Sequence, residues 1–77
     1  MTGRFTTSQG VVIAVSCSIR KVVVGNSASY AGTVDSGDFV INESMAGSGV
    51  LELEDGRKLQ IVIHNRGDFI SSGDFFS

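Results

Sequence analysis

The stretch Val50-Leu-Glu-Leu-Glu-Asp-Gly-Arg-Lys-Leu-Gln-Ile-Val-Ile-His64 decides the fold class of this 77-residue chain. Apolar and polar side chains alternate along it with a period of two on both sides of Asp55-Gly56. A period of two belongs to a strand whose two faces differ, so the stretch predicts a β-hairpin with one apolar face.

The loop of this hairpin sets its register. A two-residue loop of Asp55 and Gly56 would place Leu53 opposite Lys58 and would mix the two faces. A three-residue loop that also includes Glu54 keeps the apolar side chains together, and it puts Gly56 at the left-handed position of a type I turn with a G1 bulge. Because a slip of one residue moves every side chain to the wrong face, we predict the three-residue loop.

Outside the hairpin, residues 11–19 form the clearest strand. Their apolar side chains occupy every second position and so share one face of the strand, which we call their parity; they are Val11, Ile13, Val15, Cys17 and Ile19. The apolar parity then changes between this strand and the valines at 22–24. We interpret the change as a β-bulge at Arg20-Lys21, or as a corner where the strand passes from one sheet to another.

Shorter strands are predicted at residues 3–7, 29–34, 39–41 and 69–70, separated by turns rich in glycine and aspartate. No apolar period of 3.6 extends over ten residues, so the only helical structure expected is a single turn near residues 43–46. Ten glycines and no proline fit a protein of strands joined by tight glycine turns.

The tripeptide Gly-Asp-Phe occurs three times, at residues 37–39, 67–69 and 73–75. An offset of thirty residues aligns the segment 22–40 loosely with the segment 52–70. One interpretation is an internal duplication with pseudo-twofold symmetry. The other is that Gly-Asp is a common turn pair and that Phe begins the strand after it.

Length and strand number together predict the fold class. Seventy-seven residues leave room for one core, so residues 1–77 are expected to form one small domain. Six or seven short antiparallel strands predict an all-β barrel, SH3-like or similar, because closure hides strand edges that would otherwise recruit neighbours. A compact two-sheet β-sandwich is the alternative.

Charge and cysteine content narrow the class of partner. A net charge of −2 argues against nucleic acid as the main ligand. One cysteine excludes an intramolecular disulfide, residues 1–10 lack the pattern of a signal peptide, and the longest apolar run, residues 11–15, is too short to span a membrane. We expect a cytoplasmic protein that does not act at a membrane.

No set of residues predicts catalysis. Cys17 and His64 are each the only residue of their type, which raises the question of a nucleophile–base pair. Cys17 has the apolar parity of its strand and His64 the polar parity of the hairpin, so we expect them on opposite faces. The turn carboxylates lack the spacing of a calcium loop, and one cysteine and one histidine are too few for zinc. We therefore predict no enzyme, no cofactor and no metal site.

Two apolar segments do predict a binding function. Adjacent side chains of a strand point to opposite faces, so Phe75-Phe76 and the valines at 22–24 would each expose one member unless both segments are central in the barrel. Met45 lies in the longest irregular stretch, residues 42–49. The predicted binding residues are Val22, Val24, Met45, Phe75 and Phe76.

These residues favour a non-enzymatic protein-binding module that acts through an edge strand and an apolar patch. Its partner would be another protein or a second copy of the chain as a homodimer. A small inhibitor of a larger bacterial complex, encoded by a phage or mobile element, is a special case of this hypothesis. The alternative is a nucleic-acid-binding small β-barrel, which would need a clustered basic surface.

Overall fold

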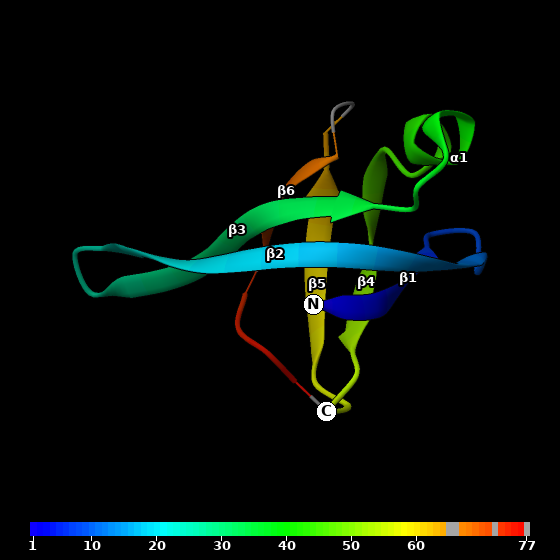
Figure 1. The fold of residues 1–77 in the computed structure, drawn as a ribbon. Helices are drawn as coiled ribbons and strands as arrows, with labels where there is room; N and C mark the ends of the chain where they lie inside the picture. Colours follow the sequence, from blue (N-terminus) through cyan, green and yellow to red (C-terminus); the bar gives the residue numbers. More distant parts are fainter. Residues whose placement is uncertain (65–66, 72, 77) are drawn as a thin grey trace.

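A computed structural model of the chain describes residues 1–64, 67–71 and 73–76, and it shows one closed, six-stranded, antiparallel β-barrel (Figure 1). The spatial order of the strands is β1-β2-β3-β6-β5-β4. This architecture confirms the predicted small all-β barrel. The elements are β1 (Thr2–Thr7), β2 (Val12–Val24), β3 (Ser27–Asp35), α1 (Phe39–Ser44), β4 (Gly47–Leu53), β5 (Lys58–Ile63) and β6 (Asp68–Ser71).

The first four strands form a Greek key. Strands β1, β2 and β3 follow one another as hairpins, and the connection that carries α1 returns the chain so that β4 lies beside β1. Arg4 in β1 therefore pairs with Ala14 of β2 on one side and with Glu52 of β4 on the other. Pairing on both sides of β1 closes the barrel at this point.

The β4–β5 hairpin has the predicted register. Leu51 pairs with Leu59, and the backbone N–H of Leu53 donates to the carbonyl of Arg57 at 2.8 Å. Gly56 occupies the left-handed region with a φ of 91° and donates its N–H to the carbonyl of Leu53. The three-residue loop with glycine at its third position is confirmed.

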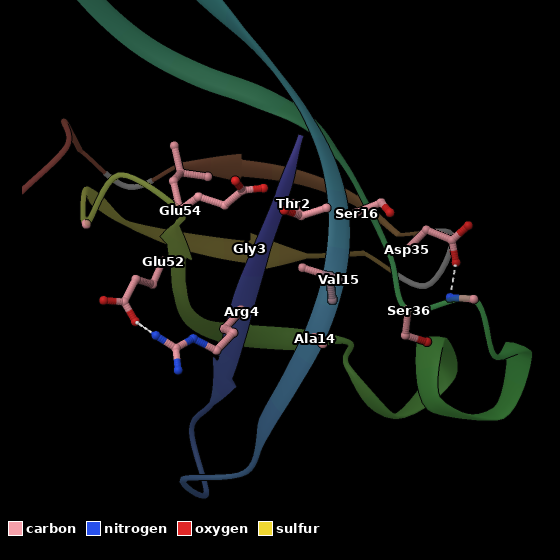
Figure 2. A pocket seen from close by; sticks show the side chains of 13 residues that line it. Thr2, Gly3, Arg4, Ala14, Val15, Ser16, Asp35, Ser36, Glu52 and Glu54 are labelled. Atoms are coloured by element: carbon pink, nitrogen blue, oxygen red, sulfur yellow. Dashed lines mark hydrogen bonds and ion pairs between the residues drawn. The ribbon is translucent and has the colours of Figure 1, made fainter.

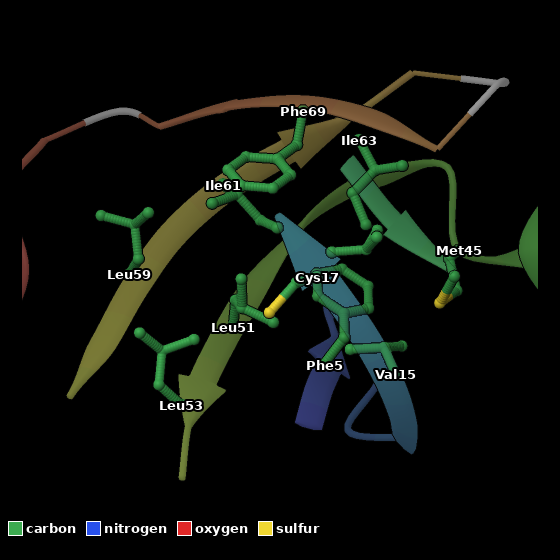
Figure 3. Close-up of a cluster of buried hydrophobic side chains, with 11 residues drawn as sticks. Phe5, Val15, Cys17, Met45, Leu51, Leu53, Leu59, Ile61, Ile63 and Phe69 are labelled. Carbon is green, nitrogen blue, oxygen red and sulfur yellow. The ribbon is translucent and has the colours of Figure 1, made fainter. Parts of the chain in front are cut away.

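The core is built from the side chains that point inward at every second position of the strands. Inward side chains from β1, β2, β3, β4, β5 and β6, together with Met45, fill the barrel and exclude solvent (Figure 3). Cys17 is part of this cluster, as its parity predicts. The buried members are Phe5, Val15, Cys17, Val34, Met45, Leu51, Leu53, Leu59, Ile61, Ile63 and Phe69.

The strand predicted at residues 39–41 is wrong, because the chain forms helix α1 there. The Asp38 carboxylate accepts hydrogen bonds from the backbone N–H groups of Val40 and Ile41 at 2.9 and 3.2 Å, which makes Asp38 the N-cap of the helix. The backbone N–H of Asn42 then donates to the Asp38 carbonyl. The cap satisfies amide groups that a helix start leaves unpaired, and it favours the helix over a strand.

The bulge predicted at Arg20-Lys21 is also wrong. The register of β2 against β3 continues without interruption from the pair Ser16–Asp35 to the pair Val24–Ser27. The β2–β3 hairpin does not turn a corner between two sheets either, since all six strands belong to one barrel. The change of apolar parity marks the place where the two strands leave the barrel.

Barrel closure also requires a residue without a side chain at position 49. Gly49 of β4 is buried and pairs with Thr7 of β1 and with Ile61 of β5. A Cβ atom built at this position would overlap the ring of Phe5 and the carbonyl oxygen of Thr6. The Phe5 ring therefore fills the space that any larger residue at position 49 would need.

We predict that Gly49→Ala lowers the free energy of unfolding by about 1–3 kcal/mol, the usual cost of overpacking a core. Gly73→Ala is the matched control, because a Cβ at position 73 meets no atom within 4 Å. Urea unfolding of both variants measures the difference. Equal stability of the two variants would contradict the tight packing of Phe5 against β4.

Candidate protein-docking surface

The outer part of the β2–β3 hairpin projects from the barrel as a two-stranded ribbon, residues 21–30, seen at the left of Figure 1. The β1–β2 ladder ends at Ser16, and β6 pairs with β3 only from Ala31 to Thr33. Beyond these points, within the described residues, the two strands of the ribbon pair with each other and with no further strand.

A tight turn ends the ribbon. Gly25 and Asn26 form a two-residue loop between the paired residues Val24 and Ser27. Gly25 has a φ of 60°, and no residue other than glycine has a positive φ in the described part of the chain. Glycine at the first loop position followed by a residue with negative φ is the pattern of a type II′ turn, whose twist matches that of paired strands.

The tip of the ribbon exposes aliphatic side chains. Val23 and Val24 are 64% and 72% exposed. Residues directly opposite each other in an antiparallel pair share a face, so Val23 lies beside Ala28 and Val24 beside Ser27. These small neighbours cannot cover the valines, and the tip is apolar on both faces.

The ribbon also leaves one edge of β2 unpaired. The backbone N–H of Cys17 donates to the Met1 carbonyl at 2.7 Å, which is the last described contact of β2 on that side. Alternate residues of an antiparallel strand direct their N–H and C=O groups to the same side. Ile19, Lys21 and Val23 therefore present backbone groups that have no partner among the described residues. We call this side the free edge, residues 18–24.

The C-terminal residues pack against the base of the ribbon. The rings of Tyr30 and Phe75 lie 4.6 Å apart between centroids, and the Arg57 guanidinium lies 4.7 Å from the centroid of Phe75. Partial burial raises the pKa of the Tyr30 phenol, and the neighbouring Asp74 carboxylate raises it further. The backbone of Phe76 exchanges two hydrogen bonds with Lys58, at 2.7 and 2.8 Å.

The predicted binding residues have different environments. Val24 is exposed on the ribbon, Val22 and Phe75 are half-buried, and Phe76 is 45% exposed. Of the two adjacent phenylalanines one is therefore exposed, the outcome expected where the segment is not central in the barrel. Met45 is 1% exposed, and its assignment as a binding residue is wrong: it ends α1 as the C-cap, and its side chain belongs to the core.

Sequence reasoning missed the apolar face of α1. Phe39 is 76% exposed, and the next two residues, Val40 and Ile41, are also exposed. An aspartate N-cap at position 38 before six residues without strict alternation was the signal that could have identified this helix.

A hydrogen-bond network fixes the start of the α1 connection. The Asn42 side-chain amide donates to the Asp35 carboxylate at 2.8 Å, and the backbone N–H of Ser36 donates to the Asn42 side-chain oxygen at 2.7 Å. The backbone N–H of Gly37 also donates to Asp35. The Asn42 amide, followed by the Gly37 N–H, lowers the pKa of the Asp35 carboxyl.

A groove of about 690 Å³ lies over β1, β2 and β4 beside the start of the α1 connection (Figure 2). Arg4 and Glu52 form an ion pair of 3.3 Å on its wall, and Asp35 and Glu54 also line it. Among the described residues that line the groove are hydroxyl and carboxylate groups, but neither the histidine nor the cysteine. Its lining therefore lacks a nucleophile paired with a histidine base.

Cys17 and His64 do not form a reactive pair. Cys17 is buried, and burial raises the pKa of its thiol, which opposes thiolate formation. His64 is exposed at the end of β5, where its backbone N–H donates to the Asp68 carbonyl. Within residues 1–64, 67–71 and 73–76, no three histidine, cysteine, aspartate or glutamate side chains come together as metal ligands.

No helix in the described part of the chain has the length and apolar character needed to cross a membrane. Comparison with protein-family models, with curated proteins and with solved structures gives no match to this chain. We therefore infer function from the geometry of the chain alone.

We predict that the Cys17 thiol reacts with a disulfide reagent slowly in the folded protein and rapidly in urea. Because burial raises its folded pKa, the unfolded chain loses the thiol proton first. The free energy of unfolding should then fall as the pH rises above about 8.5, the ordinary pKa of a thiol. Cys17→Ala, which has no thiol, should lack this part of the pH dependence, and identical pH profiles would contradict the burial of Cys17.

Proposed function

We propose that this chain is a non-enzymatic protein-binding module that docks through the ribbon. The observation that carries the proposal is the coincidence of exposed aliphatic side chains, Val23 and Val24, with an unpaired strand edge on an element outside the barrel. Unpaired edges and exposed apolar side chains are both surfaces that recruit another chain.

Inhibition is the form of protein binding that requires the fewest functional groups of the chain. Adding a strand to a larger assembly would occupy a site on that assembly and would require no catalytic group. This form agrees with the hypothesis of a small inhibitor of a bacterial complex, encoded by a phage or mobile element. A reducing, cytoplasmic location would suit the lone free thiol of Cys17.

The charge distribution favours protein over nucleic acid. Arg4 and Arg57 are engaged with Glu52 and Asp55, at 3.3 and 2.8 Å, and the net charge is −2. A nucleic-acid-binding barrel would be expected to combine a basic surface with aromatic side chains on which bases can stack. Tyr30 and Phe75 instead contact each other in a tilted arrangement.

The proposal predicts position-specific contacts with a second polypeptide. A photoreactive phenylalanine analogue at position 24, in cells that produce the protein, should form one discrete protein adduct on irradiation, because this position lies at the exposed tip. The same analogue at Ser48, an exposed position on the barrel wall, is the control and should give no such adduct. The adducts are compared by gel electrophoresis and identified by mass spectrometry.

Adding Val23→Ser to the labelled chain should reduce the adduct at least several-fold, because it removes aliphatic surface from the other face of the same tip. Adducts of equal yield at positions 24 and 48, or an adduct that contains nucleic acid, would contradict the proposed function.

A further inference from the structure

We infer that the free edge of β2 binds an extended, acidic segment of the partner protein by strand addition. This inference rests on the proposed function, and it specifies both the binding mode and the chemistry of the partner. It is derived from the unpaired backbone, from the side chains next to it, and from the separation of charge along the chain.

The backbone of the free edge is ready to accept another strand. The N–H and C=O groups of Ile19, Lys21 and Val23 point away from β3, and no described residue pairs with β2 on that side after Cys17, which bonds to Met1. Three alternate residues span about 13–14 Å at the rise of an antiparallel strand. This length matches a short added strand of four to five residues.

The side chains of the free edge select the charge of that strand. Residues 18–34 contain two charged side chains, Arg20 and Lys21, and both are exposed and basic. The rest of the chain carries four basic and eight acidic side chains. Basic charge is therefore concentrated where the backbone is unpaired, and opposite charges across neighbouring strands stabilise their pairing.

A second copy of the chain would pair poorly with the same edge. Pairing residues 18–24 with themselves about a two-fold axis would place Lys21 directly opposite Lys21 of the second copy. Like charges in that position destabilise a strand pair. The two basic side chains thus disfavour self-association while they favour an acidic partner.

The aliphatic side chains next to these two charges argue that Arg20 and Lys21 do not serve merely to block strand addition at this edge. Proteins often block an exposed edge with lysine or arginine, with a short strand or with a bulge. Here β2 runs on past Lys21 in register with β3 and carries the consecutive valines 22–24, of which two are highly exposed. An added strand with alternating acidic and aliphatic residues would contact both the basic and the apolar part of the edge.

The test uses three synthetic peptides with blocked termini. The first alternates valine and glutamate over eight residues, the second replaces each glutamate by lysine, and the third is the acidic peptide with N-methyl groups on alternate amides. Each is titrated into the ¹⁵N-labelled chain, and amide chemical shifts and hydrogen exchange are followed. The acidic peptide should shift signals of residues 18–24 in a saturable way and slow amide exchange at Ile19, Lys21 and Val23.

The backbone amides of the peptide and the charges of the protein are then varied separately. The N-methyl peptide should lose binding because it cannot complete the ladder. The double variant Arg20→Glu/Lys21→Glu should bind the acidic peptide about tenfold more weakly and should prefer the lysine peptide, since the charge pair on the face that carries the glutamates changes from attractive to repulsive in either register. The double variant Arg4→Gln/Lys58→Gln, which removes basic charge from the barrel wall, should bind the acidic peptide as the unmodified chain does.

Four results would overturn the inference. Equal binding of the acidic and lysine peptides would remove the charge selection, and a dimer by light scattering with protected amides at residues 19–23 would show self-pairing. No effect of the acidic peptide on residues 18–24, while the adduct at position 24 still forms, would overturn strand addition and leave the proposed function intact. Saturable shifts of the same residues with an oligothymidylate of fifteen nucleotides, but with no peptide, would overturn both.

Discussion

The fold depends on a row of four inward side chains that lie in register across neighbouring strands. Ile13 of β2 pairs with Phe5 of β1, Phe5 pairs with Leu51 of β4, and Leu51 pairs with Leu59 of β5. The row joins the first hairpin of the chain to the hairpin of β4 and β5, although these segments are far apart in sequence. Packing along it stabilises the β1–β4 pairing, which closes the barrel.

Closure has a direct consequence for function. Each strand of the barrel has a neighbour on both sides, so the paired residues of the described barrel wall offer no edge to another chain. In the described part of the chain, β2 and β3 are the longest strands, and they extend past their neighbours on the barrel. The same pairing that stabilises the fold thus leaves the ribbon as the place where the proposed strand addition can occur.

Strict alternation made much of the barrel predictable from the sequence. The faces of the β4–β5 hairpin and the burial of Cys17 follow from parity alone, because one face of each strand must meet the core. The ribbon could not be predicted, since nothing in β2 itself says where its neighbours end. The Gly-Asp-Phe repeats also show that identical local sequences can adopt different structures. Asp38 caps a helix, whereas Asp68 begins β6 and its backbone carbonyl accepts a hydrogen bond from the His64 N–H.

The most direct test of the account is the stability of a shortened chain. Removing residues 23–24 and 27–28 joins the Val22–Ser29 pair, which is hydrogen-bonded like Val24–Ser27, to the same Gly25-Asn26 turn, and none of the deleted residues belongs to the core. If the ribbon serves docking and not folding, urea unfolding should remain cooperative, with a free energy within about 1 kcal/mol of that of the full chain. Loss of cooperative unfolding would show that the ribbon is part of the barrel's own stability, and it would contradict the account.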